Sequence, residues 1–218
     1  GRAWVSPVDA GLYMSLIVRP KRPTAQIPLL TFAAGVAVAD AIRSIADIKV
    51  GLKWVNDIIF EHRKVGGILA EMPASRATPD ATGANKAQPP AVIVGIGINV
   101  NLKTEDIPEE LSTRIDSLSR ISGNDEDPNA IAAAIARGLE DTYQLLEPNR
   151  NHELTDRWRA LSITIGQEIV TENSERKIEG RAVDITDSGA LIVESADGQR
   201  HTLHAGEISI RTKDGSYC

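Results

Sequence analysis

The last quarter of the chain carries the sequence pattern that restricts the possible folds most. From residue 163 to residue 211, five short runs alternate apolar and polar residues, with Asn-Ser, Asp-Ser-Gly and Asp-Gly between them. Alternation with a period of two between such turn residues is typical of short antiparallel strands. The spacing predicts a small antiparallel β-barrel of about 50 residues, which we assign to residues 163–218.

Residues 1–162 alternate strand and helix signals instead, which predicts an α/β or α+β domain. The segment 73–90 is rich in small, polar and proline residues and is expected to form a mobile loop. Pro28 suits the first turn of a helix, and Pro20 and Pro23 would close the strand before it. The expected strands are 11–18, 51–60, 64–72 and 91–102, and the expected helices are 27–46, 129–147 and 154–161.

Composition excludes several classes of protein. The net charge of -6 argues against a nucleic-acid module. No apolar run approaches the roughly 20 residues that span a bilayer, and the first residues lack a secretory signal. The single cysteine, Cys218, fits a reducing cytosol. The four histidines have no metal-site spacing, so no protein-bound metal is expected.

The stretch "GLKWVNDIIF", residues 51–60, places a lysine among apolar residues. If it is one strand, Lys53, Val55 and Asp57 share a face, and Trp54 and Asn56 share the other. One interpretation is a solvated Lys53 face above a Trp54 core. The other is an ammonium that points into a pocket for an anion.

The stretch "VIVGIGINVN", residues 92–101, carries two glycines in a strand pattern. Gly95, Gly97, Asn99 and Asn101 fall on one face. Glycines inside a strand indicate a close approach by a ligand or another backbone, or else a bulge. The spacing fits neither a Rossmann fingerprint nor a P-loop.

Six motifs in this order resemble the biotin protein ligases: "GRAWVSP", "GLYMSL", "GLKWVNDI", "KVGGILAE", "GIGINVN" and "GEISIR". The resemblance covers nearly the whole chain. It implies a catalytic domain around a mixed sheet, like that of class II synthetases, followed by an SH3-like barrel. Enzymes of this family join biotin to ATP, with Mg²⁺ on the phosphates, to give biotinyl-5'-AMP. They then transfer biotin to a lysine of a biotin carboxyl carrier domain of acetyl-CoA carboxylase or another carboxylase.

The resemblance assigns roles to particular residues. Lys53 would be the catalytic cation between the biotin carboxylate and the α-phosphate. Asn56 and Asp57 would fix the lysine strand, with a nucleotide contact by Asn56 as the alternative. The other expected biotin and ATP contacts are Arg2, Trp4, Gly95, Gly97, Asn99 and Arg211, of which Trp4 has an ordinary core role as its alternative.

The family usually has more sequence before the position of Gly1, so a chain beginning there is expected to be impaired in biotin binding. It would also lack the DNA-binding domain that some members carry. The expected location is the cytoplasm, away from membranes, and a homodimer stays open. A lipoate-type ligase and a non-catalytic protein-binding fragment are the alternatives.

Overall fold

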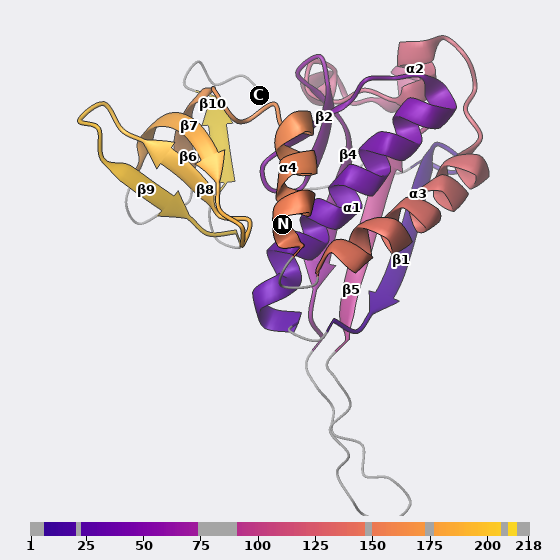
Figure 1. The fold of residues 1–218 in the computed structure, drawn as a ribbon. Coiled ribbons are helices and arrows are strands. Elements are labelled where there is room, and N and C mark those ends of the chain that lie inside the picture. Colours follow the sequence, from indigo (N-terminus) through magenta and orange to yellow (C-terminus); the bar gives the residue numbers. More distant parts are fainter. Residues whose placement is uncertain are drawn as a thin grey trace, which may run out of the picture.

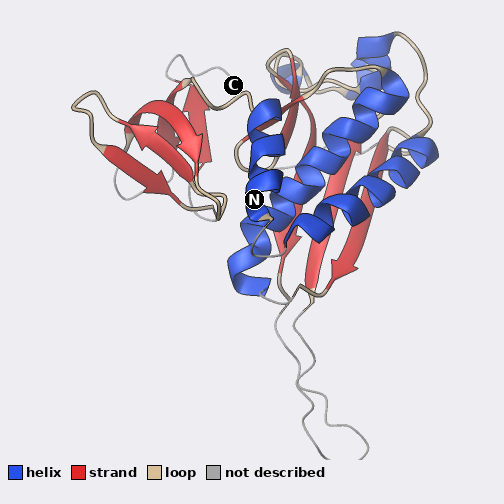
Figure 2. Cartoon of the chain, in the orientation of Figure 1, coloured by secondary structure: helices blue, strands red, loops and turns tan. Residues whose placement is uncertain are grey.

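A computed structural model describes residues 7–20, 23–73, 91–146, 150–172, 177–205 and 209–212. They form two five-stranded sheets, with strand orders β1-β5-β4-β3-β2 and β10-β6-β7-β8-β9, and the pairings between these strands are antiparallel. Figures 1 and 2 show helices lying against one face of the first sheet, with the second sheet beside them. Of the loop expected at 73–90, residues 74–90 fall outside the described residues.

The first sheet follows the expected order of strands along the chain. Its strands are β1 (Gly11–Val18), β2 (Gly51–Lys53), β3 (Asp57–Phe60), β4 (Arg63–Glu71) and β5 (Val92–Asn99). In β5, Val92, Val94, Ile96 and Ile98 are buried, whereas the residues between them are half-buried. This alternation is the period of two that one helix-covered face requires.

Helices α1 (Pro23–Ala46), α3 (Pro128–Tyr143) and α4 (Asn151–Leu161) cover that face, and α1 contacts both other helices as well as β4 and β5. Asp127 caps α3 by accepting a hydrogen bond from the Asn129 N–H at 2.8 Å. The shorter helical segments are η1 (Thr104–Asp106), η2 (Glu109–Leu111), α2 (Leu118–Ser122) and η3 (Gln144–Leu146).

Helix α1 corrects two expectations. It begins at Pro23, so Pro28 lies inside the helix rather than in its first turn, and Pro23 opens the helix rather than closing the strand. Its segment Gln26–Ala46 is also long and apolar enough to cross a membrane, which the sequence reading missed because Asp40 and Arg43 interrupt the run. The segment's apolar window is 72% buried inside the protein, however, so its apolar surface is used by the core.

The second sheet contains the five predicted runs as β6 (Glu168–Glu172), β7 (Glu179–Ile185), β8 (Leu191–Glu194), β9 (Arg200–Leu203) and β10 (Ser209–Thr212). The Asp-Ser-Gly and Asp-Gly signals form the turns between strands, with Gly189 and Gly198 at positive φ. We call residues 163–212 the barrel domain.

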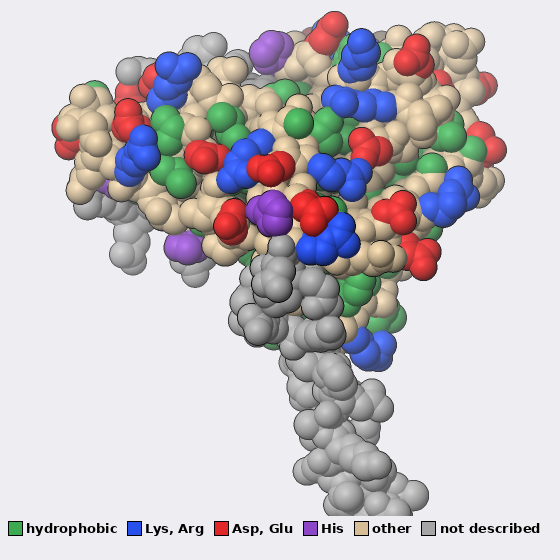
Figure 3. Space-filling model, viewed as in Figure 1, with side chains coloured by type: hydrophobic (Ala, Val, Ile, Leu, Met, Phe, Trp, Pro, Cys, Tyr) green, Lys and Arg blue, Asp and Glu red, His purple; other side chains and the backbone are tan. Residues whose placement is uncertain are grey.

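Most of the buried apolar side chains of the barrel domain belong to the same hydrophobic cluster as those of α1. Trp158 on α4, which is 1% exposed, stacks on Phe32 of α1 with ring centroids 4.4 Å apart. Trp158 is therefore a core residue. Over the face seen in Figure 3, acidic and basic side chains are interspersed rather than gathered by sign.

Candidate active site

Lys53 lies at the end of β2, where the chain turns sharply back into β3. Residues 54–56 form the turn, and Lys53 pairs with Asp57 across the two strands. The expectation of one continuous strand over 51–60 is therefore wrong, because residues 54–56 form a turn that separates β2 from β3. Lys53 is nevertheless only 5% exposed, so the interpretation of a solvated Lys53 face is also wrong.

Asn56 holds this turn in place. Its Nδ2 donates to the Ile68 carbonyl at 2.8 Å, and the Ile68 N–H donates to the Asn56 carbonyl at 2.9 Å. Asp57 forms an ion pair with Lys64 of β4. Both residues thus fix the lysine hairpin to the neighbouring strand, as one interpretation expected, while a nucleotide contact by Asn56 stays a prediction.

A row of paired residues crosses the whole sheet at the level of Lys53. The pairings run from Lys53 to Asp57, then to Gly67, Gly97 and Tyr13. Directly paired residues of antiparallel strands point to the same face. This face lies opposite the helices, since the residues that alternate with the row pack against α1. The row therefore places two glycines in the middle of a sheet face, with Lys53 at one end.

The two glycines leave the middle of this row without side chains of its own. A Cβ on Gly67 would lie 3.1 Å from both Cε and Nζ of Lys64, so that lysine lies over the glycine. With Lys64 lying over Gly67, this part of the face combines glycine backbone with two ammonium groups and one carboxylate. We call Lys53, Asp57, Lys64, Gly67 and Gly97 the lysine–glycine row. Such an arrangement suits a flat ligand that carries negative charge.

Further along the same face, large apolar side chains are exposed. The exposed fractions are 49% for Tyr13, 65% for Ile17 and 56% for Leu69. By the strand pairing, Ser15, Gly95 and Leu69 form the next row and Ile17 the row after it. This apolar area continues the lysine–glycine row, so the face combines one charged end with one apolar part.

Asn99 lies at the end of β5 and is 5% exposed. Its Nδ2 donates to the Asp116 carbonyl at 3.0 Å, so it holds the loop after η2 against the sheet. Asp116 in turn pairs with Arg63 at 3.0 Å and with Arg120 at 3.1 Å. Sequence reasoning did not single out Asp116, because its partner Arg63 lies 53 residues earlier in the chain.

The remaining predicted site residues are not tested by the structure. Arg2 and Trp4 lie outside the described residues. Arg211 lies on β10, half-buried and paired with Val170, and its contact with a nucleotide stays a prediction. Gly95 and Gly97 lie on the open face as expected, and their contact with a ligand stays a prediction as well.

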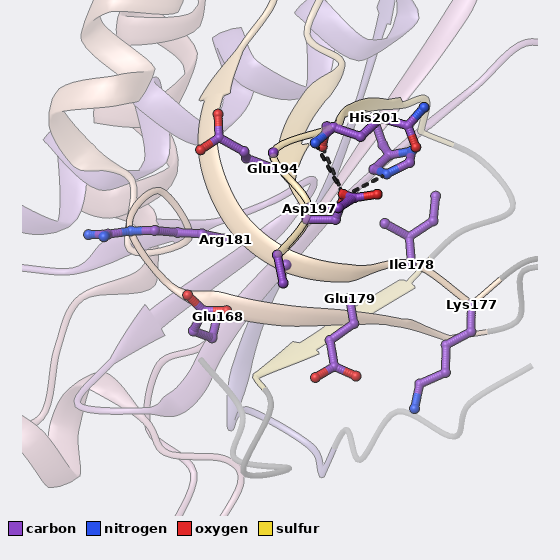
Figure 4. A pocket seen from close by; sticks show the side chains of 13 residues that line it. Glu168, Lys177, Ile178, Glu179, Arg181, Glu194, Asp197 and His201 are labelled. Atoms are coloured by element: carbon purple, nitrogen blue, oxygen red, sulfur yellow. Dashed lines mark hydrogen bonds between the residues drawn. The ribbon is translucent and has the colours of Figure 1, made fainter.

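A broad hollow of about 750 Å³ opens on the barrel domain (Figure 4), and none of its lining residues belongs to the lysine–glycine row. Ser195 Oγ donates to Asp197 at 2.6 Å and lies 3.1 Å from His201 Nε2. The hydrogen bond from Ser195 holds the pKa of Asp197 below its usual value.

Within the described parts of the chain, no three acidic, histidine or cysteine side chains are grouped to hold a metal ion.

Two parts of the chain match known families. Residues 1–80 match the "Biotin/lipoate A/B protein ligase family", and residues 164–211 match the "Biotin protein ligase C terminal domain".

Curated relatives extend these matches over nearly the whole chain. It is 34% identical to the "Bifunctional ligase/repressor BirA" of Bacillus spizizenii over 96% of its own length, and spans 61% of that protein. It is 31% identical to the "Biotin--[acetyl-CoA-carboxylase] ligase" of Mycobacterium tuberculosis, covering 95% of this chain and 72% of the relative.

Among solved structures, the fold is similar to that of the biotin protein ligase from Aquifex aeolicus in complex with biotin and ATP. The TM-score is 0.80 at 28% identity, over 98% of this chain and 83% of that one.

Proposed function

The chain belongs to the biotin protein ligase family, and we propose that it activates biotin with ATP and transfers it to a protein lysine. In the first step, a biotin carboxylate oxygen attacks the α-phosphorus of ATP, and pyrophosphate leaves. In the second, the amine of the acceptor lysine attacks the carbonyl carbon of biotinyl-5'-AMP, and AMP leaves. The proposed acceptor is a biotin carboxyl carrier domain of acetyl-CoA carboxylase or another biotin-dependent carboxylase.

The observation that carries this proposal is the buried Lys53 at the end of the lysine–glycine row. The two reacting groups are both anions and repel one another until a cation lies between them. An ammonium that is 5% exposed is little screened by water, so it stabilises the negative charge that grows on the phosphorus. Lys53 therefore has the charge and the surroundings that the first step requires.

We propose that the two halves of the adenylate bind on the face of the sheet opposite the helices. We place the phosphate at Lys53 and the nucleotide along Gly95 and Gly97 of β5, with Asn99 at the end of that strand. Arg2, Trp4 and Arg211 are proposed as further contacts from outside the lysine–glycine row. Mg²⁺ would arrive on the ATP phosphates as part of the substrate, because Asp57 and Asp116 are already paired with basic residues.

We place the reaction in the cytoplasm, in keeping with the single cysteine. Light scattering of the purified protein would show whether it forms a homodimer. The proposed role of Lys53 depends neither on the cellular location nor on the oligomeric state.

The test is ATP–pyrophosphate exchange in the presence of biotin or of lipoate, followed by transfer to a purified carrier domain. Exchange that depends on biotin supports the proposal, whereas exchange that depends on lipoate alone would assign the chain to lipoate chemistry. A protein that binds the carrier domain but catalyses neither exchange would be a non-catalytic fragment. To test Lys53 itself, exchange is compared between Lys53→Ala and the matched control Lys49→Ala, which removes an exposed lysine just before the same strand.

A further inference from the structure

The edge strand that carries Lys53 has a neighbour on its outer side. The Ile163 N–H donates to the Leu52 carbonyl at 3.0 Å, and Leu52 forms a parallel bridge with Ser162. Residues 162–163 are the segment through which the chain enters the barrel domain. The first sheet is therefore continued beyond β2 by the connection to the barrel.

Trp54, the residue after Lys53, is bonded to the barrel domain at two points. Its backbone N–H donates to Thr164 Oγ1 at 2.9 Å, and its indole N–H donates to the Gly189 carbonyl at 3.1 Å. Trp54 is 4% exposed and Thr164 is fully buried. A buried donor that loses its partner is not compensated by water, so both bonds constrain the position of Trp54.

The turn that holds Gly189 is itself rigidly placed. Gly189 has a φ of 84°, and its N–H donates to the Thr186 carbonyl at 2.9 Å. A Cβ at Gly189 would lie 3.2 Å from Cβ of Pro28 on α1, so the turn packs closely against that helix. Nearby, Arg159 of α4 bonds to Asp184 at 2.7 Å and to the Ile185 carbonyl at 2.8 Å.

We propose that the barrel domain positions the catalytic lysine, with Trp54, Thr164 and Gly189 as the positioning residues. This inference rests on the proposed function, in which Lys53 acts on the phosphate. β2 contains only three residues, so its pairing with β3 provides few contacts to hold the end of the strand. The two bonds of Trp54 fix the backbone next to Lys53 from the other side. The barrel domain thus contributes to the adenylation step itself.

Three variants test the two bonds in the full chain. Trp54→Phe keeps a buried ring but removes the indole donor, and Thr164→Val removes the hydroxyl acceptor at nearly constant volume. We expect kcat for biotin-dependent pyrophosphate exchange to fall roughly ten- to a hundredfold in each, the scale of a 1 Å misplacement. KM values for biotin and ATP should change by less than about threefold, because substrate contacts are kept. Thr164→Ser restores the hydroxyl and should recover most of the parental kcat.

Trp158→Phe is the matched control, because it shortens another buried indole in the same core and should leave kcat near the parental value. The same Trp54→Phe change is also made in a Lys53→Ala background. If Trp54 acts through Lys53, Trp54→Phe should cause no further loss of kcat in the Lys53→Ala background. An additional loss of similar size in that background, or an equal loss from Trp158→Phe, would show a general packing effect and overturn the proposal.

Hydrogen exchange of residues 51–57 provides a readout that does not depend on activity. We expect faster exchange in Trp54→Phe and Thr164→Val but not in Thr164→Ser. If the parental protein shows no biotin-dependent exchange of pyrophosphate, the proposed function fails, and the hydrogen-exchange comparison still decides whether the barrel domain holds the hairpin. Unchanged protection in both variants would refute the positioning role.

Discussion

Replacing Lys53 with alanine should remove most of the adenylation activity while the fold is kept. Lys53 is 5% exposed, so its charge acts through a medium much less polar than water. With an effective dielectric constant near 20, a unit charge about 4 Å away is stabilised by about 4 kcal/mol. Loss of a single transition-state donor in other enzymes costs about 3–4 kcal/mol, and the two magnitudes agree. We therefore expect kcat to fall by roughly 10²- to 10³-fold.

The assay is biotin-dependent ATP–pyrophosphate exchange, with Lys49→Ala as the control and thermal unfolding as the check on folding. The variant should unfold cooperatively, and the control should keep its parental rate. A kcat for Lys53→Ala within threefold of the parental value, in a folded protein, would refute the argument. A second variant, Lys64→Ala, separates the two ammonium groups of the lysine–glycine row. It should affect the rate less, because the Lys64 side chain is 22% exposed and its charge is screened more by water than that of Lys53.

Three further outcomes follow from the contacts of the barrel domain. Gly189→Ala should lower the free energy of unfolding by about 1–3 kcal/mol, since it combines a positive φ with a Cβ 3.2 Å from Pro28, and chemical denaturation measures this. Burial opposes the charge of Asp184, but hydrogen bonds from Arg159 and from the Ile185 N–H outweigh it and hold the pKa of Asp184 below its usual value. The stabilisation is therefore present above about pH 4, the unfolded pKa, and is lost as the pH falls through the folded pKa. Because Asp184 is half exposed, Asp184→Asn should cost at most about 1 kcal/mol at pH 7 and less at pH 3, as thermal melts across this range would show. Deleting residues 163–218 should reduce adenylation as well as transfer, because Trp54 loses both of its partners; adenylation at the parental rate would contradict this.

Elements whose signals lie in neighbouring residues could be predicted without the structure. The alternation of Val92, Val94, Ile96 and Ile98 predicted a strand with one buried face, since a period of two is a property of neighbouring residues. The five runs of the barrel domain were predicted in the same way from alternation and turn residues. Lys53 was singled out because a charged side chain within an apolar stretch is unusual, and this is visible from its immediate neighbours.

How these elements meet depends on contacts between distant segments, which only the folded chain shows. The turn at residues 54–56 interrupts what reads as one apolar strand, and it depends on the bonds between Asn56 and Ile68. The partners of Trp54 lie 110 and 135 residues further along the chain. Local propensity describes a residue and its near neighbours, whereas these contacts depend on which distant segments the core brings together. The pattern of the chain therefore predicts the strand beside Lys53, and only the packed fold shows that the barrel domain holds it.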